Sequence, residues 1–134
     1  MNIEIIFAEF GGRGAANQKW ESDIGRLDPT YSSVKEYFPE AKIICYTDDK
    51  SIGDNYDVEV RFIDSDSTPF DKDYKEGSGK LKWGYHCCDY YQIKGLLESK
   101  ADIAIAVDSD LMFVSEEVRT IIPILSDFCE GLLK

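Results

Sequence analysis

Features that would mark a membrane-spanning, zinc-binding or secreted protein are scarce in this sequence. No apolar run approaches the ~20 residues that a membrane-spanning helix needs, so we expect no membrane span. The chain has one histidine, His86, and four cysteines that form no CxxC pair, which argues against a zinc site. The start of the chain lacks the basic and apolar regions of a signal peptide. We therefore expect a cytoplasmic protein with reduced thiols.

Basic residues are also in the minority, with 15 Lys and Arg against 26 Asp and Glu. The net charge of −11 argues against nucleic acid and anionic membranes as partners, because both attract basic surfaces. A single phosphorylated metabolite is compatible with this charge, because a metal ion can neutralise its phosphates. Hydrophobic residues make up 43% of the chain, enough for one core, so we predict a single domain over residues 1–134.

The apolar segments predict alternating strands and helices. Strands are expected at Ile3–Phe10, Ala41–Thr47, Val58–Ile63 and Ile103–Val107, and helices at Asp28–Phe38, Leu81–Ser99 and from Glu116 onward. Asp28 as N-cap and Pro29 as first helical residue favour the start of the first helix. The β-α-β order implies parallel strands with right-handed crossovers. We therefore predict an α/β fold with a mainly parallel sheet and helices on both faces.

Hydrophobic patterning also suggests where some of these elements lie. The strand Val58–Ile63 alternates apolar and polar residues, so we expect it near an edge of the sheet. The uninterrupted apolar run Ile103–Val107 is typical of a central strand covered on both faces. Pro123 lies inside the last helix, where we expect a kink or a break into two pieces.

Two loops resemble ligand-binding segments without matching a known pattern. The glycine-rich turn at residues 11–14 could hold phosphates, but its spacing is neither GxGxxG nor a P-loop, so a surface loop is favoured. Residues 64–80 carry alternating acidic residues but lack the glycine and closing glutamate of an EF-hand. We interpret this loop as a mobile lid rather than a calcium site. His86 is interpreted as a residue of the following helix rather than as a catalytic base.

The strongest candidate site is the triplet Asp108-Ser109-Asp110, which directly follows the apolar strand Ile103–Val107. On an extended backbone, residues i and i+2 face the same side, ~7 Å apart. Two ionised carboxylates at that spacing repel each other unless a cation lies between them. Oxygen ligands suit Mg²⁺ or Mn²⁺, which would stabilise negative charge on a leaving phosphate. The alternative is a pair of solvated or capping aspartates.

The order of elements and the triplet together resemble the GT-A glycosyltransferases, enzymes with a Rossmann-like half and a DxD motif. The resemblance rests on IEIIFAEF and IICYTDD as strands, and on WGYHCCDYYQIKGLLESKADIAIAVDSDLMF as the helix, strand and motif. It implies a Rossmann-like fold and a nucleotide-diphospho-sugar as donor, with an acceptor that the sequence does not identify. It also implies that Asp110 coordinates Mn²⁺ or Mg²⁺, and that Asp108 reaches the ribose or binds the metal through water.

The same resemblance implies a set of nucleotide-binding residues. The end of the first strand would line the nucleoside pocket with Phe7, Ala8 and Glu9. Asp48, at the end of the second strand, would lie beside the base. Lys82 and Tyr85 would lie near the ribose or the diphosphate.

The chain departs from the family pattern in ways that leave other functions open. The helix before the motif reads HCCDYY, with Asp89 where some relatives carry a lysine. The acceptor-binding half, which would supply the catalytic base, is expected to be missing after residue 134. One alternative is a catalytically incomplete domain that binds nucleotide sugar or metal without turnover. Another is a phosphotransfer or nucleotidyl-transfer domain that uses the same aspartates. A homodimer across an open sheet edge is a further hypothesis.

Overall fold

The computed structural model describes residues 1–10, 27–70, 79–108 and 111–133, with backbone only at 79–82, 126 and 129–133. In this part of the chain, four parallel strands form one sheet in the order β3-β2-β1-β4. The strands are β1 (Ile3–Glu9), β2 (Lys42–Thr47), β3 (Glu59–Phe62) and β4 (Ile103–Ala106). The predicted strands are therefore confirmed, as is the predicted edge position of the third.

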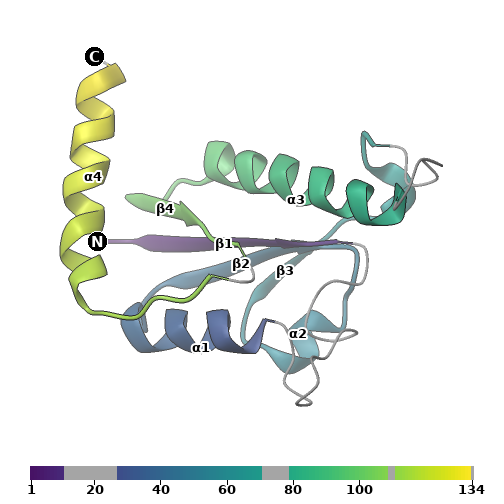
Figure 1. The fold of residues 1–134 in the computed structure, drawn as a ribbon, viewed down its shortest axis with the longest axis horizontal. Helices are drawn as coiled ribbons and strands as arrows, with labels where there is room; N and C mark the ends of the chain where they lie inside the picture. Colours follow the sequence, from purple (N-terminus) through teal and green to yellow (C-terminus); the bar gives the residue numbers. More distant parts are fainter. Residues whose placement is uncertain (11–26, 71–78, 109–110, 134) are drawn as a thin grey trace.

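Helices cover both faces of the sheet (Figure 1). They are α1 (Asp28–Tyr37), α2 (Ile52–Asn55), α3 (Gly79–Glu98) and α4 (Glu117–Leu133), with a short 3-10 turn at Ser65–Ser67. Helices α1 and α2 lie on one face and α3 on the other, as Figure 1 shows. The α/β, Rossmann-like architecture predicted from the sequence is confirmed. Within the described residues, no helix is long and apolar enough to span a membrane.

Strand β1 organises the core because it pairs with β2 on one side and β4 on the other. Its side chains alternate between the two faces, as a β-strand requires. Ile5 and Phe7 pack with residues of α1 and β2, whereas Ile6 and Ala8 pack under α3. All four side chains are buried. Each face of the sheet thus has its own apolar cluster, separated by the plane of β1 and β2.

Helix α3 lies close against the sheet at Gly95. A Cβ atom there would lie 2.8 Å from Ile6 Cγ2 and 3.0 Å from a ring carbon of Tyr46. Farther along the same face, Phe10 stacks on Tyr91 with ring centroids 5.0 Å apart, and Trp83 meets Phe10 edge-on at 6.0 Å. Phe10, Trp83 and Tyr91 are therefore core residues, whereas Tyr85 and Tyr90 of α3 are exposed.

Strand β4 is an edge strand, which corrects the prediction of a central position. Among the described strands it pairs with β1 alone, and Ala104, Ile105 and Ala106 are only half-buried. Its continuous apolar run does reflect contacts on both faces, because Ala104 packs against the α3-side cluster and Ile105 against the α1-side cluster. Apolar contacts on the two faces of a strand do not show whether it has a neighbour along each lateral edge. The apolar pattern therefore could not predict that β4 lies at the edge of the sheet.

The start of α1 differs from the predicted cap. Leu27 occupies the N-cap position, and no side chain caps the helix there. Asp28 is the first helical residue, and its carboxylate instead accepts a hydrogen bond from the Tyr56 hydroxyl. Pro29 lies in the first turn as predicted. This contact ties α1 to the residue that ends α2, a four-residue helix that the polar sequence at 51–57 did not reveal.

Helix α4 runs through Pro123 without a break, so of the two predicted alternatives, a kink or a division into two pieces, the division is wrong. Its first turn is held by the Ser115 hydroxyl, which accepts a hydrogen bond from the Glu117 N–H at 3.2 Å. The helix then stands at the amino end of the sheet and extends away from it (Figure 1). Several apolar residues of this helix are exposed, among them Ile121, Leu125 and Phe128.

Candidate functional site

The strand order creates a switch point between β1 and β4. From β1 the chain crosses through α1 to β2 on one side, whereas β4, which follows α3, lies on the other side of β1. In open α/β sheets, ligands bind outside the carboxyl ends of the strands at such a point. The Val107 N–H donates to the Ile6 carbonyl at 3.0 Å, so pairing with β1 continues one residue past β4. Asp108 therefore emerges at the carboxyl edge of the sheet, next to the end of β1.

Asp108 is an exposed carboxylate whose orientation is set by α3. Its Oδ1 accepts a hydrogen bond from Gln92 Nε2 at 3.0 Å. Its backbone carbonyl accepts a hydrogen bond from the Leu111 N–H at 3.1 Å. Ser109 and Asp110 lie outside the described residues, so the predicted pairing of Asp108 and Asp110 stays a prediction. The described carboxylate is an oxygen donor of the kind that Mg²⁺ and Mn²⁺ prefer, so it fits the implied metal.

The described residues alone do not complete a metal centre. Within residues 1–10, 27–70, 79–108 and 111–133, no group of three or more His, Cys, Asp or Glu side chains is close enough together to hold an ion. Magnesium usually keeps several waters and binds through one or two carboxylates plus substrate phosphates. A single described carboxylate at the rim is therefore compatible with such an ion, whose other ligands would be Asp110 and the substrate.

The end of β1 is more deeply buried than a pocket lining would be. The side chain of Phe7 is fully buried in the α1-side cluster, so its predicted role beside a nucleoside gains no support from its position. Ala8 packs under α3, and its carbonyl accepts a contact from Cys88 Sγ at 3.0 Å. Glu9, at the carboxyl end of β1, is only 3% exposed. Burial raises the pKa of Cys45, and the nearby Glu9 carboxylate raises it further.

At the end of β2, two neighbouring aspartates have different roles. Asp49 builds the turn into α2, because its Oδ1 accepts from the Ser51 N–H at 2.9 Å and the Ser51 hydroxyl at 2.6 Å. Its own N–H donates to the Thr47 hydroxyl at 3.0 Å. Asp48 is half-buried at the same carboxyl edge as Asp108. The structure thus assigns Asp49 to the turn and brings Asp48, the predicted base neighbour, to the shared rim.

The first turns of α3 contribute one described candidate. Tyr85 is 47% exposed, whereas the side chain of Lys82 lies outside the described residues. His86 is exposed, and its ring lies 5.6 Å from that of Phe70. Burial raises the pKa of the Cys87 thiol to about 11, so this thiol stays protonated at neutral pH and is a poor nucleophile.

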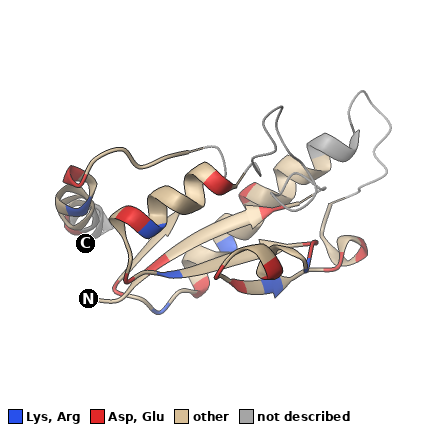
Figure 2. Ribbon diagram, turned by 90° about the horizontal axis from the view of Figure 1, so that it is seen from below, with Lys and Arg blue, Asp and Glu red and all other residues tan. Residues whose placement is uncertain are grey.

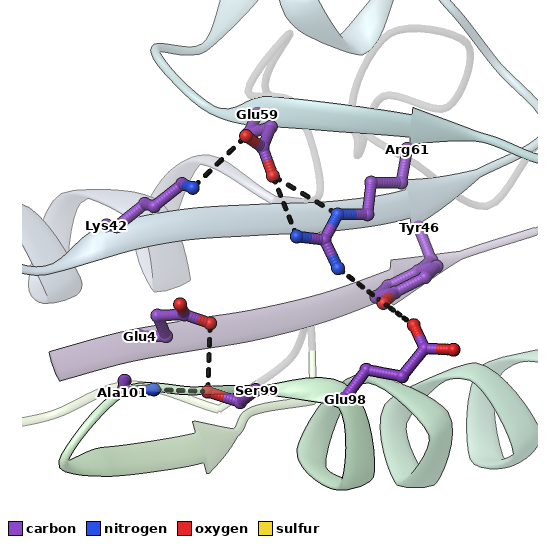
Figure 3. A network of polar contacts seen from close by, with 8 residues as sticks. All are labelled: Glu4, Lys42, Tyr46, Glu59, Arg61, Glu98, Ser99 and Ala101. Carbon is purple, nitrogen blue, oxygen red and sulfur yellow. Dashed lines mark hydrogen bonds and ion pairs between the residues drawn. The ribbon is translucent and has the colours of Figure 1, made fainter.

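A second polar cluster lies on the α3 face of the sheet and is structural in character (Figure 3). The Tyr46 hydroxyl accepts from Arg61 Nη1 at 2.7 Å and donates to Glu98 Oε2 at 3.2 Å. Hydrogen bonds from Lys42 and Arg61 hold the pKa of Glu59 below its usual range. Because its charges are mutually satisfied and join β2, β3 and α3, we assign this cluster to the scaffold. Charged residues of both signs are interspersed over the rest of the described fold (Figure 2).

Two cavities of about 270 and 400 Å³ open at the opposite, amino edge of the sheet. Both are lined by Met1, Ile3 and Glu40, and the smaller one also by Arg119 and Pro123 of α4. Neither contains a predicted site residue. We place the candidate site at the carboxyl edge, because strand order and the exposed Asp108 coincide there.

Gln92 is the functional candidate that sequence reasoning missed. It lies next to Tyr91 on the flank of α3 that faces β4, where its amide contacts Asp108. The available signal was a single uncharged polar residue beside the buried stripe of α3, which is too common a feature to identify a site.

Comparison of the chain with known protein families, with curated proteins and with solved structures found no match. The resemblance to the GT-A glycosyltransferases therefore stays a prediction from the sequence.

Proposed function

We propose that this chain binds a nucleotide-diphospho-sugar through Mn²⁺ or Mg²⁺ at Asp108 and Asp110, and transfers the sugar to an acceptor that is not identified. The observation that carries the proposal is the position of Asp108. This exposed carboxylate follows an apolar parallel strand at the switch point between β1 and β4. Open α/β sheets bind nucleotides and their phosphates at that point.

The candidate residues along the carboxyl edge of the sheet would contact different parts of the donor. Asp108 and Asp110 would hold the ion, which when bound supplies Lewis-acid stabilisation of the leaving diphosphate. Asp48 would lie beside the base. Tyr85, exposed on α3, and Lys82 would lie near the ribose or the diphosphate. We assign no residue as catalytic base.

A catalytically incomplete domain is the second candidate, and one observation favours it. Ile124 and Phe128 of α4 are each 63% exposed, and β4 has one open edge among the described strands. A soluble protein rarely leaves such apolar surface uncovered unless it binds something. A domain that needs a further unit for turnover would bind nucleotide sugar without transferring it.

Two expectations about location and assembly stay predictions. A cytoplasmic protein is expected from the sequence. A homodimer would form through the exposed residues of α4 or the open edge of β4. Light scattering over a range of protein concentrations measures its mass, and a monomer at every concentration would contradict the dimer.

The binding step is tested by titrating UDP, GDP and their sugars with and without Mn²⁺ while following thermal stability. At 100 times Kd, a bound nucleotide should add about 2.7 kcal/mol to the free energy of unfolding. We expect one nucleotide to stabilise the protein only when Mn²⁺ is present. Asp108→Ala and Asp110→Ala should abolish this response.

The matched control is Asp127→Ala, which removes an exposed carboxylate of α4 far along the chain from the rim. This variant should respond to nucleotide and Mn²⁺ like the wild type. If the wild type responds to no nucleotide, the proposed function is wrong. If it binds a nucleotide sugar but a product assay detects neither transfer nor hydrolysis, the catalytically incomplete domain is supported instead.

A further inference from the structure

Helix α3 supplies a side chain that reaches the end of β4. Gln92 is half-buried, and its amide nitrogen Nε2 lies 3.0 Å from Asp108 Oδ1 and 3.4 Å from the Val107 carbonyl oxygen. One amide group thus contacts both the last residue that pairs with β1 and the first residue of the candidate site. The contact spans 16 residues of sequence and joins a 20-residue helix to the sheet edge.

The chemistry of the two partners fixes which end of the Gln92 amide faces them. A carbonyl oxygen and an ionised carboxylate can only accept hydrogen bonds. The NH₂ group has two hydrogens, one for each partner, whereas a flipped amide would point its oxygen at two other oxygens. The donor is therefore directed at Asp108, and its position is held by the backbone contact to Val107.

We propose that Gln92 is a positioning residue that holds the Asp108 carboxylate ready for the cation of the nucleotide diphosphate; this inference rests on the proposed function. An exposed aspartate after a strand would otherwise exchange between rotamers. Carboxylates that bind metals are commonly oriented by an outer hydrogen bond of this kind. Among the described residues, the Gln92 amide donates to Oδ1, and no hydrogen bond is made to Oδ2.

A neutral amide suits this role better than the charged side chains available to a helix. Lysine or arginine at position 92 would also donate to Asp108, but its positive charge would repel the incoming cation. Glutamate would add negative charge but could not donate. Glutamine orients the carboxylate and leaves its charge for the metal.

The first measurement is the affinity for Mn²⁺ in the presence of UDP or GDP, by calorimetry. Gln92→Leu keeps the size of the side chain and removes both donors. Because loss of an outer hydrogen bond to a metal ligand typically weakens metal binding about 10- to 100-fold, we expect a loss of that size. Lys94→Leu is the matched control, because Lys94 is a half-buried residue of α3 that pairs with Glu98 instead. It should bind Mn²⁺ like the wild type.

The second measurement follows the side-chain NH₂ signals of Gln92 by NMR in the metal-free protein, assigned from their loss in Gln92→Leu. Asp108→Ala removes the acceptor, so these signals should shift and their hydrogens should exchange faster with solvent. Asp127→Ala should leave them unchanged. This readout reports the contact itself and does not depend on metal or nucleotide binding.

The two measurements distinguish a failure of the positioning role of Gln92 from a failure of the proposed function. If the wild type binds Mn²⁺ and nucleotide but Gln92→Leu binds them equally well, the positioning role is wrong and the proposed function stands. If the wild type binds neither, the proposed function fails and the cation-directed role of Gln92 fails with it. Gln92 signals that do not respond to Asp108→Ala would overturn the positioning contact in either case.

Discussion

The β1–β2 pair and the β4–α4 region contain similarly apolar sequences but differ sharply in burial. Ile5, Ile6 and Ile44 are at most 1% exposed. In β4 only Ile103 is buried, and in α4 the residues Ile124 and Phe128 are each 63% exposed. Strand β1 has neighbours on both sides and helices on both faces, whereas among the described strands β4 has a neighbour on one side only. Apolar content therefore measures the tendency to form an element, and the number of its neighbours decides how deeply it is buried.

This difference bears on the candidate site, because Asp108 belongs to the less buried region. The most deeply buried side chains of the sheet lie in the β1–β2 pair rather than in β4. Substitutions around Asp108 should thus change binding with little effect on the stability of the whole domain. The amide contact from Gln92 adds to the hydrogen bond from the Val107 N–H to the Ile6 carbonyl and to the burial of Val107, which also hold the end of β4.

The largest effect should come from truncating an isoleucine in the two regions. Ile44→Ala removes a side chain that is 1% exposed between α3 and the sheet. We expect it to lower the free energy of unfolding by about 2–5 kcal/mol, as cavity-forming core substitutions do. Ile124→Ala makes the identical change in α4 and should stay within about 0.5 kcal/mol, as surface substitutions do. Urea unfolding of both variants, followed by circular dichroism, gives the two values.

The same two isoleucine variants can also contradict the difference in burial between the two regions. Equal losses in the two variants would mean that α4 is covered in solution. If the loss in Ile124→Ala grew with protein concentration, a second copy would be the cover, because dimer stability depends on concentration.

A smaller effect is expected at two glycines. A Cβ at Gly95 would meet Ile6 at 2.8 Å and Tyr46 at 3.0 Å, all inside the well-packed region. Gly95→Ala should therefore cost about 1–3 kcal/mol through overpacking, despite the roughly 1 kcal/mol that alanine gains over glycine in a helix. At Gly53, the described neighbour that a Cβ would meet is Val60 Cγ2, at 3.0 Å. Gly53→Ala should cost less, because one side-chain methyl group can shift at the sheet edge. Thermal unfolding measures both, and a Gly95→Ala protein as stable as the wild type would show that α3 can move away from the sheet.

Much of the fold could be predicted from the sequence, because the elements that form are the ones with strong local signals. The apolar runs around Ile5 and Ile44 predicted two strands, the segment Leu81–Ser99 predicted the long helix, and the alternation of strands and helices predicted the parallel order. What failed depends on partners distant in the sequence. Asp28 has the residue type of an N-cap, yet its carboxylate bonds Tyr56, 28 residues away. The edge position of β4 and the exposed face of α4 likewise depend on which elements lie beside them.

For the candidate site, the sequence located Asp108 but not its surroundings. An aspartate at the end of an apolar strand is a local signal, and Asp48 is found by the same reasoning at the end of β2. Phe7 was expected beside a nucleoside, but alternation along β1 directs its side chain into the core. The sequence gives no distinctive signal for Gln92 as a site residue, because its contact with Asp108 depends on how α3 packs beside the end of β4. Contacts between elements, rather than residue types, separate positioning residues from core residues.

The smallest effect should come from the ion pair that anchors α4 to the body of the fold. Arg119 contacts both carboxylate oxygens of Glu40, at 2.5 and 3.0 Å, and also donates to the Tyr37 carbonyl. These contacts hold the pKa of Glu40 below its usual range. A carboxyl with a lowered folded-state pKa stabilises the fold above its unfolded pKa of about 4.3, and this contribution is lost as pH falls through the folded pKa.

Glu40→Gln should therefore lower the urea midpoint slightly at pH 6, and the difference from wild type should vanish as the pH falls well below about 4. We expect a smaller effect than at either Ile44 or Gly95, because the pair is exposed to solvent and screened by salt. Glu36→Gln removes an exposed carboxylate of α1 and serves as the control, with no comparable pH-dependent difference. A difference for Glu40→Gln that persists unchanged at low pH would show that its cause is packing of α4 rather than charge. The amino-terminal turns of α4 would then belong with the well-packed region, and the boundary between the two regions would lie within the helix.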